Sequence, residues 1–317
     1  MNPYWNLEAL KNIHQDIAPF IKKTPVLTSE TLNSILSSKI FFKAENFQWG
    51  GAFKLRGAVC ALRKLSKDQR AKGVITHSSG NHAQALAIAA KKMGIEATVV
   101  MPETSTRVKI NAVRDYGAEV IFCKPSFLER ERMTTQLIKQ EGYTFIPPFD
   151  HQDIISGQST AGKELIEEID DLDMILVPVG GGGLLAGTAL AAHHFGKSDC
   201  KVIGCEPEMA DDAYRSFKAG KLIKGEDNPM TICDGLKTSL GRLNFAVIMN
   251  FVENIVTVDE KSIKNAMKFV FERLKIVVEP SSCAVVAALL EEKINVRNRR
   301  VGVILSGGNV NFPEGLI

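Results

Sequence analysis

The chain has 317 residues, of which 45% are hydrophobic and 24% are charged, and its formal net charge is +3. This composition is typical of a globular protein, and a small charge spread evenly along the chain gives no reason to expect a nucleic-acid partner. No apolar run approaches the roughly 18 residues that a membrane span needs. The six cysteines lack the paired spacing of a metal site, and no signal peptide is visible, so we expect a cytoplasmic protein.

Short apolar runs alternate with segments of helical periodicity along most of the chain. The N-terminal part predicts, in order, a helix over 6–20, an extended segment at 24–27, a short helix ending at 36, a strand at 40–43 and a helix over 58–65. The middle predicts strands at 73–77, 97–101, 119–123 and 144–146, which alternate with helices over 82–93, 106–116 and 127–140. The remainder predicts helices near 159–169 and over 184–194, 261–274 and 282–292, with strands at 174–179, 201–206, 255–258 and 300–305.

This alternation predicts an α/β fold with mostly parallel sheets flanked by helices. Polar stretches at 66–73 and 147–158 indicate domain boundaries. We therefore expect a large domain formed by residues 1–67 and 151–317, and a small domain formed by residues 68–150. Sites in such folds lie at the carboxyl ends of the strands and between domains.

Four consecutive glycines, Gly180, Gly181, Gly182 and Gly183, join a predicted strand to a predicted helix. Glycines let backbone N–H groups converge, and the start of the helix adds partial positive charge, so this loop is suited to a phosphate. A tight turn needed only for packing is the alternative. The loop also fits Gly-x-Gly-x-x-Ala, and Glu206 ends the next predicted strand, where an acid binds ribose in dinucleotide sites. An NAD-dependent dehydrogenase is therefore one candidate.

Lys54 stands in a turn between Gly51 and Gly57. Its neighbours Phe53 and Leu55 are apolar, and a desolvated lysine has a lowered pKa and a nucleophilic amine. Taken by itself, the pattern would also fit a surface lysine on an ordinary turn.

Two further polar loops follow predicted strands. Residues 78–82, Ser-Ser-Gly-Asn-His, lead into a helix, and small polar donors at a helix start suit a carboxylate. Capping of that helix by Ser79 or Asn81 is the alternative. Residues 306–309, Ser-Gly-Gly-Asn, follow the last predicted strand, which places Ser306 either in a site or in a plain terminal turn.

Together these motifs resemble those of the serine/threonine dehydratases and serine racemases, which are pyridoxal-phosphate enzymes of the tryptophan-synthase β-subunit fold (fold type II). The resemblance rests on residues 43–48 with 51–58, on 78–82, on 180–183 and on 306–309, in that order and spacing. The sequence departs from the family at Ala52, where many members have Ser, and at Asn311, where Asp is frequent. By resemblance, the large domain binds the cofactor and the small, mobile one binds the substrate.

The resemblance implies a role for each motif. Lys54 would bind pyridoxal phosphate covalently and take the Cα proton of the substrate, and Ser79 would donate a proton on the opposite face. The other implied cofactor contacts are Phe53 against the ring, Asn81 at the ring hydroxyl, residues 180–183 around the phosphate and Ser306 at the pyridine nitrogen. The substrate carboxylate would be held by Ser78, Ser79, Asn81 and His82.

The implied activity is that of an ammonia-lyase, which converts L-serine or L-threonine to a 2-oxo acid and ammonia, together with serine racemase activity. A 3-hydroxyaspartate ammonia-lyase is the alternative within the family. Arg130 would then grip the second carboxylate, unless it is a surface arginine of its helix. The sequence does not rank these substrates. A dehydrogenase and a non-catalytic amino-acid-binding protein stay the candidates of other classes.

Residues 206–212 resemble the cation loop of the family. Glu206, Asp212 and the carbonyl of Ala210 would bind Mg²⁺ or Ca²⁺, since hard cations prefer oxygen ligands. Acids at the start of a helix are also favourable without a metal, which is the alternative. The remaining expectations are a small amino-acid substrate, no membrane partner and a homodimer.

Overall fold

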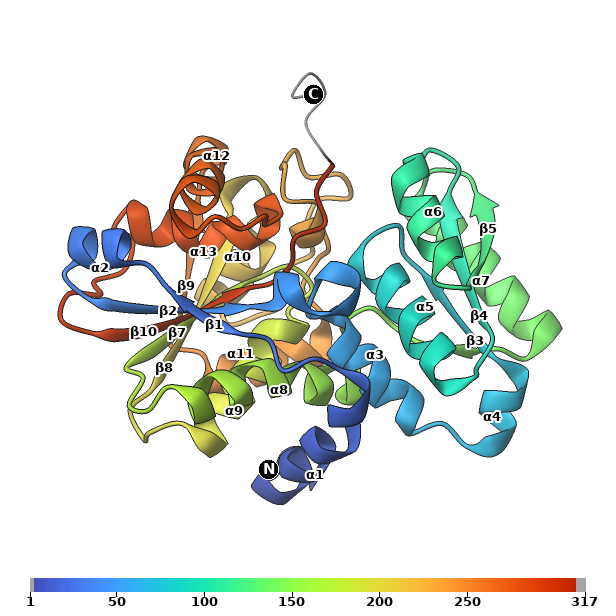
Figure 1. Ribbon diagram of the computed structural model, residues 1–317. Coiled ribbons are helices and arrows are strands. Elements are labelled where there is room, and N and C mark those ends of the chain that lie inside the picture. Colours follow the sequence, from blue (N-terminus) through green and yellow to red (C-terminus); the bar gives the residue numbers. More distant parts are fainter. Residues whose placement is uncertain (1–2, 312–317) are drawn as a thin grey trace.

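The computed structural model describes residues 3–311, apart from the side chains of Pro3 and Phe127. The described strands form a six-stranded sheet in the order β1-β2-β10-β7-β8-β9 and a four-stranded sheet in the order β5-β4-β3-β6. Neighbouring strands are parallel except for β1 and β2. The two sheets lie side by side, and helices flank both of them (Figure 1). The predicted α/β fold with mostly parallel sheets is confirmed.

The larger sheet takes strands from both ends of the chain. They are β1 (Val26–Thr28), β2 (Lys39–Ala44), β7 (Met174–Pro178), β8 (Lys201–Pro207), β9 (Asn254–Val258) and β10 (Arg300–Leu305). The smaller sheet consists of β3 (Val74–His77), β4 (Ala97–Pro102), β5 (Glu119–Cys123) and β6 (Thr144–Phe145). All of its strands lie within the predicted small domain, 68–150, whose boundaries stay a prediction.

The described helices connect these strands in chain order. The first seven are α1 (Leu7–Ile17), α2 (Glu30–Leu36), α3 (Lys54–Arg63), α4 (Lys67–Lys72), α5 (Asn81–Met93), α6 (Arg107–Asp115) and α7 (Phe127–Glu141). The others are α8 (Gln152–Glu168), α9 (Gly183–Phe195), α10 (Asp212–Ala219), α11 (Arg242–Phe251), α12 (Glu260–Phe269) and α13 (Pro280–Leu290). None of them combines the length and apolarity that a membrane crossing requires, as far as residues 3–311 are concerned.

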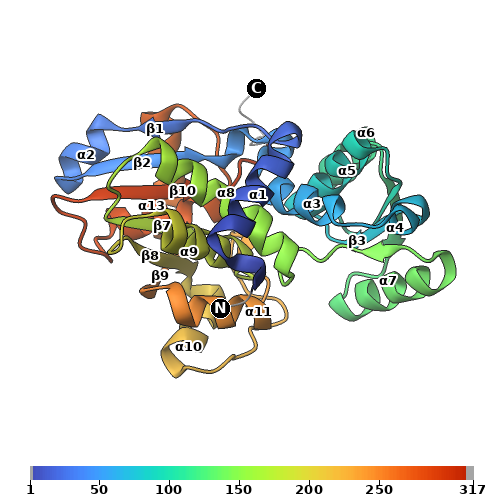
Figure 2. The same cartoon turned by 90° about the horizontal axis from the view of Figure 1, so that it is seen from below.

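The larger sheet is apolar on both faces. Met174 and Leu176 of β7 point into a cluster with α2, α12 and α13, whereas Ile175 and Val177 point into a second cluster with α8, α9 and α11. Figure 2 views the molecule from the side of α8 and α9. Because side chains alternate between the two faces and both are covered, these strands are continuous apolar runs.

Helix α3 packs between α5 of the small sheet and α8 of the large one. Its residues Leu55 and Leu62 belong to an apolar cluster that also contains Leu86 of α5. On its other side, a Cβ at Gly157 of α8 would lie 2.4 Å from the backbone carbonyl oxygen of Arg56, so α3 and α8 approach more closely than a larger residue at position 157 would allow. The start of α3 is therefore fixed from both sides.

Several helices differ from those predicted. Helix α3 begins at Lys54 rather than at 58, and α8 begins at Gln152 rather than near 159. The stretches 66–73 and 147–158, which we interpret from sequence as boundaries, contain α4 and the first turns of α8. The error in α8 arises because its polar side chains, such as Asp153 and Ser159, are buried instead of exposed. Helices α10 and α11 are absent from the predicted elements.

Candidate active site

Lys54 occupies the first position of α3, directly after the turn at 50–53. Its Nζ donates a hydrogen bond to the carbonyl of Pro148 at 2.7 Å. Burial lowers the pKa of Lys54 to about 8, and the carboxylate of Glu279 opposes this shift. The predicted desolvated lysine is thus present, and the alternative of a plain surface lysine is wrong.

The loop after β10 pairs with the turn that carries Lys54. The backbone N–H of Phe53 donates to the carbonyl of Ser306 at 3.0 Å, and that of Gly308 donates to Gly51 at 2.8 Å. The Oγ of Ser306, a residue that is 3% exposed, lies 3.1 Å from Oγ of Ser282. The loop is therefore part of the site and not a terminal turn.

Asn81 is held by two residues from the C-terminal part of the chain. Its Nδ2 donates to both carboxylate oxygens of Glu279, at 2.9 and 3.1 Å, and its Oδ1 accepts from Asn309 at 2.9 Å. Burial raises the pKa of Glu279 to about 7, and the hydrogen bond from Asn81 opposes this shift. These contacts fix the start of α5 against the loop after β10.

The tetraglycine loop lies against the linker between β6 and α8, which carries Pro148 and Phe149. A Cβ at Gly181 would lie 2.4 Å from the ring of Phe149, and a Cβ at Gly182, where φ is +91°, would lie 2.5 Å from Leu240. Within residues 3–311, no group accepts the backbone N–H of Gly181, Gly182 or Gly183. Three free donors at the start of a 13-residue helix are suited to an anion, as the sequence predicts for this loop.

The loop 78–82 lies near Lys54, whose charge acts on His82. Its helix α5 begins after Gly80, which makes no side-chain cap, so the alternative that Ser79 or Asn81 caps α5 is wrong. Ser78 accepts a hydrogen bond from the N–H of Gly80 at 3.3 Å. The ring of His82 faces the carbonyl of Ile146 at 3.0 Å, and burial lowers its pKa to about 3. The His82 side chain is therefore neutral, and its backbone N–H is the donor left for a carboxylate.

Comparison with known proteins establishes the family to which the chain belongs. Residues 17–307 match the family described as pyridoxal-phosphate dependent enzyme. The chain belongs to this family. It is 47% identical over 299 residues to the L-threo-3-hydroxyaspartate ammonia-lyase of Saccharomyces cerevisiae, in a match that covers 94% of this chain and 91% of that protein. It is equally 47% identical over 299 residues to a serine racemase of Schizosaccharomyces pombe, with 94% and 92% covered.

A solved structure agrees with the sequence relatives. The serine racemase from Dictyostelium discoideum matches with a TM-score of 0.92 at 44% identity, covering 97% of this chain and 99% of that one. The predictions of a pyridoxal-phosphate enzyme and of its fold type are confirmed. The dehydrogenase and the non-catalytic binding protein are wrong.

The site of this pyridoxal-phosphate enzyme fits its cofactor. The free N–H groups at 181–183 suit a phosphate, the amine of Lys54 suits a covalent link to an aldehyde, and the hydroxyl of Ser306 suits a pyridine nitrogen. Phe149 joins the glycine loop to Pro148, the hydrogen-bond partner of Lys54. The glycine loop and the lysine thus both contact the segment that carries Pro148 and Phe149.

Arg130 lies on α7, close to the end of β3. Burial lowers the pKa of His77, the last residue of β3, and the charge of Arg130 lowers it further. Since Ser78 follows His77 directly, the guanidinium is near the loop 78–82. The charge of Arg130 therefore acts near the loop 78–82, and its contact with a substrate stays a prediction.

The expected cation loop contains two buried carboxylates. Glu206 is fully buried and accepts hydrogen bonds from the N–H groups of Ala213 and Tyr214, at 3.2 and 2.8 Å. Asp212 accepts from the N–H of Leu240 at 2.7 Å. Burial raises the pKa of both acids, and the charge of Asp212 raises that of Glu206 further. Ala210 ends the turn between them. Within residues 3–311, no three His, Cys, Asp or Glu side chains gather into a metal site.

Two residues of the site are absent from the sequence predictions. Glu279 binds Asn81 across 198 positions of sequence, and Ser282 exchanges hydrogen bonds with the backbone of Gly307 and contacts Ser306. Their only local signal is Pro280 at the first position of α13, which marks a helix start. That signal does not distinguish a site residue from an ordinary helix start.

Proposed function

We propose that this chain is an ammonia-lyase that acts on L-serine and L-threonine and also racemises serine. The observation that carries the proposal is the amine of Lys54, which has a pKa of about 8 and lies beside the anion-binding glycine loop and the loop 78–82. Roughly a tenth of such an amine is uncharged at pH 7 and able to act as a base. The names of the relatives support the reaction class, as does a solved threonine deaminase with 40% identity and a TM-score of 0.91.

Each group of site residues has its own role in the proposed reaction. Bound pyridoxal phosphate supplies the electron sink that makes the Cα–H bond of an amino acid acidic. Lys54 takes this proton, and the N–H groups at 181–183 hold the phosphate. The free N–H groups of Asn81 and His82, at the start of α5, hold the substrate carboxylate. The Cα–H and β-C–O bonds break and the proton and hydroxyl leave as water; the released enamine becomes an imine, which a water molecule hydrolyses to a 2-oxo acid and ammonia.

Racemisation needs a second proton-transfer group on the face opposite Lys54. Ser79 supplies the hydroxyl in this proposal, since it lies in the loop 78–82 and does not cap α5. Ser79→Ala is expected to keep the deamination of L-serine but to lose the formation of D-serine. Equal loss of both activities would leave Ser79 with a role in substrate binding only.

A 3-hydroxyaspartate ammonia-lyase is the second candidate, and the position of Arg130 favours it. A guanidinium that faces the end of β3 is able to grip the second carboxylate of an acidic substrate with two hydrogen bonds. Arg130→Ala is then expected to reduce the turnover of 3-hydroxyaspartate much more than that of serine. Equal losses on both substrates would contradict this role.

The remaining features of the proposal concern the whole enzyme. A divalent cation, Mg²⁺ or Ca²⁺, would bind Glu206, Asp212 and the carbonyl of Ala210, where it would relieve the repulsion between two buried carboxylates. We include a homodimer, a mobile substrate domain at 68–150 and a cytoplasmic location on the basis of the sequence alone.

The test compares the purified wild type with Lys54→Ala and with Lys67→Ala, an exposed lysine of α4. The wild type and Lys67→Ala are expected to show a near-visible cofactor absorbance that borohydride abolishes, and to release ammonia and 2-oxo acid from a panel of serine, threonine and 3-hydroxyaspartate. Lys54→Ala should lose both signals while it stays folded. Steady turnover by Lys54→Ala without added amine would overturn the proposal.

A further inference from the structure

His82 makes a directed contact that substrate binding does not require. It lies in the first turn of α5 and is 2% exposed. Its Nε2 is 3.0 Å from the carbonyl oxygen of Ile146. A carbonyl only accepts, so Nε2 carries the proton, and in a neutral ring Nδ1 then holds a lone pair. Among the described residues, Nδ1 has no hydrogen-bond partner, so the bond to Ile146 alone sets the orientation of the ring.

Both backbone polar groups of Ile146 are hydrogen-bonded. Its N–H donates to the carbonyl of Ile75 in β3 at 2.9 Å, and its own carbonyl accepts from His82. The next two residues are Pro147 and Pro148. A proline ring fixes φ near −65° and also restricts the residue before it to extended conformations. The backbone segment 146–148, which we call the strut, is therefore stiff. The position of the Pro148 carbonyl then follows from the position of Ile146.

The end of this strut is the hydrogen-bond acceptor of Lys54. The carbonyl of Pro148 accepts from Nζ at 2.7 Å. The groups that face Lys54 electrostatically are Glu279 and His82, and those that face His82 are Lys54 and His77. Since the His82 ring is neutral, Glu279, whose pKa burial raises to about 7, is the acid among these groups that faces the amine, and it is the same in wild type and in the variants below.

We propose that His82 is a positioning residue for Lys54, because it fixes, through Ile146 and the two prolines, the carbonyl that orients the amine. This inference rests on the proposed function, in which Lys54 takes the Cα proton. The role expected for His82 from sequence, to hold the substrate carboxylate, then falls to its backbone N–H group. The imidazole acts on the base, and the backbone N–H of the same residue acts on the substrate.

The test uses His82→Leu, which removes the donor at similar volume, and His82→Gln, whose amide is able to restore a donor near the position of Nε2. The first readout is the rate at which apoprotein reacts with pyridoxal phosphate as a function of pH. The lost carbonyl contact stabilises the charged, protonated amine more strongly than the neutral amine, so in His82→Leu the midpoint should fall by about one pH unit. In His82→Gln most of this shift should be absent.

The second readout separates positioning from substrate binding. In His82→Leu, kcat for L-serine should fall about tenfold with little change in KM, because the backbone N–H groups of the loop remain. Pro147→Ala keeps the His82 contact but loosens the strut, so it should shift the loading midpoint in the same direction. Pro147→Ala therefore tests the same inference if His82→Leu does not fold.

A raised KM with an unchanged loading midpoint in His82→Leu would overturn the inference and assign the side chain to the substrate. An unchanged midpoint in Pro147→Ala would overturn it as well. The loading assay does not depend on the reaction catalysed. A shifted midpoint in a protein that releases no ammonia would therefore refute the proposed function and keep the role of His82.

Discussion

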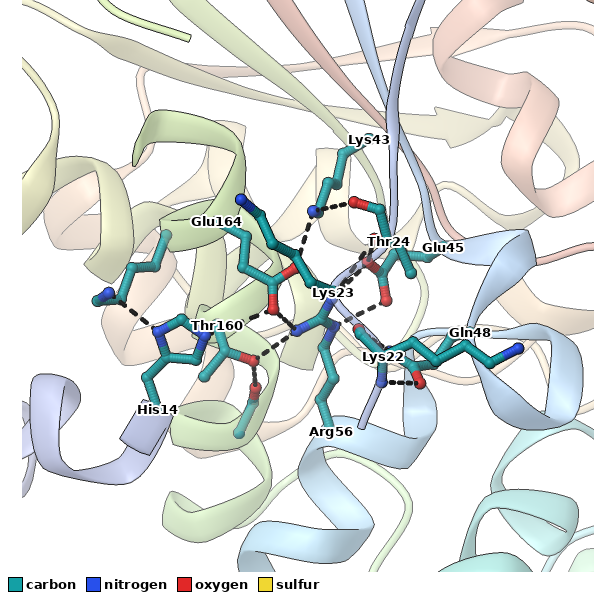
Figure 3. Close-up of polar contacts among 12 residues, drawn as sticks. His14, Lys22, Lys23, Thr24, Lys43, Glu45, Gln48, Arg56, Thr160 and Glu164 are labelled. Carbon is teal, nitrogen blue, oxygen red and sulfur yellow. Dashed lines mark hydrogen bonds and ion pairs between the residues drawn. The ribbon is translucent and has the colours of Figure 1, made fainter. Parts of the chain in front are cut away.

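The replacement Glu164→Gln is expected to lower the free energy of unfolding by about 4 kcal/mol. Glu164 belongs to a buried cluster with Arg56, Lys43 and Glu45, none of which is more than 3% exposed. Arg56 donates to both carboxylates at 2.7–2.8 Å, and Lys43 lies 2.8 Å from Glu164 (Figure 3). Two positive and two negative charges thus balance in the interior.

The magnitude follows from this balance. The substitution keeps the shape of the side chain but leaves one positive charge without a partner in the core, and such losses cost about 3–5 kcal/mol. Both oxygens of Glu164 accept from cationic donors, Arg56 on one and Arg56 with Lys43 on the other. The amide nitrogen of Gln must therefore face a donor wherever it is placed, which adds to the cost.

Urea unfolding at pH 7 measures the effect, with Glu167→Gln as the matched control. Glu167 lies one turn away and pairs with Lys163, but it is 51% exposed, so its loss should cost at most about 0.5 kcal/mol. The double variant Lys43→Met/Glu164→Gln restores neutrality. It should be less destabilised than the sum of its single variants by about 1 kcal/mol or more.

The stabilising effect of Glu164 should also depend on pH. Its hydrogen bonds from His14 and Arg56 and the charges of Arg56 and Lys43 outweigh burial and hold the pKa of Glu164 well below its usual range. For a lowered pKa, the stabilisation is fully present above the unfolded value of about 4.3 and is lost as the pH falls towards the folded value. The gap between wild type and Glu164→Gln should therefore shrink below about pH 4. A gap under about 1 kcal/mol at pH 7, or one that does not shrink in acid, would refute this account.

Three further predictions concern the site. Glu279→Gln should lower the pKa of Lys54 below its value of about 8, because Glu279 opposes the effect of burial; NMR of labelled lysine side chains measures this, and an unchanged pKa would contradict it. Gly181→Ala should weaken pyridoxal phosphate binding about tenfold, since its Cβ would collide with the ring of Phe149. Fluorescence titration measures this affinity, and an affinity equal to that of the wild type would contradict the prediction. Chelation should lower the melting temperature of the wild type, with Mg²⁺ restoring it, but should leave Glu206→Gln unaffected; identical responses of both proteins speak against the cation site.

The parts of the fold that the sequence predicts well are those whose signal is local. Strands β7, β8 and β10 lie within one residue of the predicted ranges, because both of their faces are buried and each is one apolar run. The loops with chemistry follow these strands, so their convergence could be inferred from parallel topology alone. The tetraglycine loop and Ser306 are found in this way, whereas Lys54 is predicted from its glycine and apolar neighbours.

The parts that the sequence does not predict depend on contacts between distant residues. Helix α8 carries Asp153, Gln158 and Ser159 inside the protein, and nothing in their local pattern distinguishes a buried polar face from a solvated one. Glu279 acquires its role only because Asn81 meets it in space. Similarly, the His82 ring faces Ile146, 64 positions later, so its orientation is a product of the fold.

The lysine and the buried ion pairs share one helix, and this links stability to chemistry. The first turn of α3 begins after Phe53, which provides no side-chain cap, and an uncapped turn frays easily. Two residues beyond Lys54, however, Arg56 is anchored to Glu45 and Glu164 in the core. The ion pairs therefore hold the turn that a cap would otherwise hold. For this reason Glu164→Gln should increase amide hydrogen exchange at the start of α3 more than at its end, and it should loosen the amine of Lys54 although no substituted atom reaches the site.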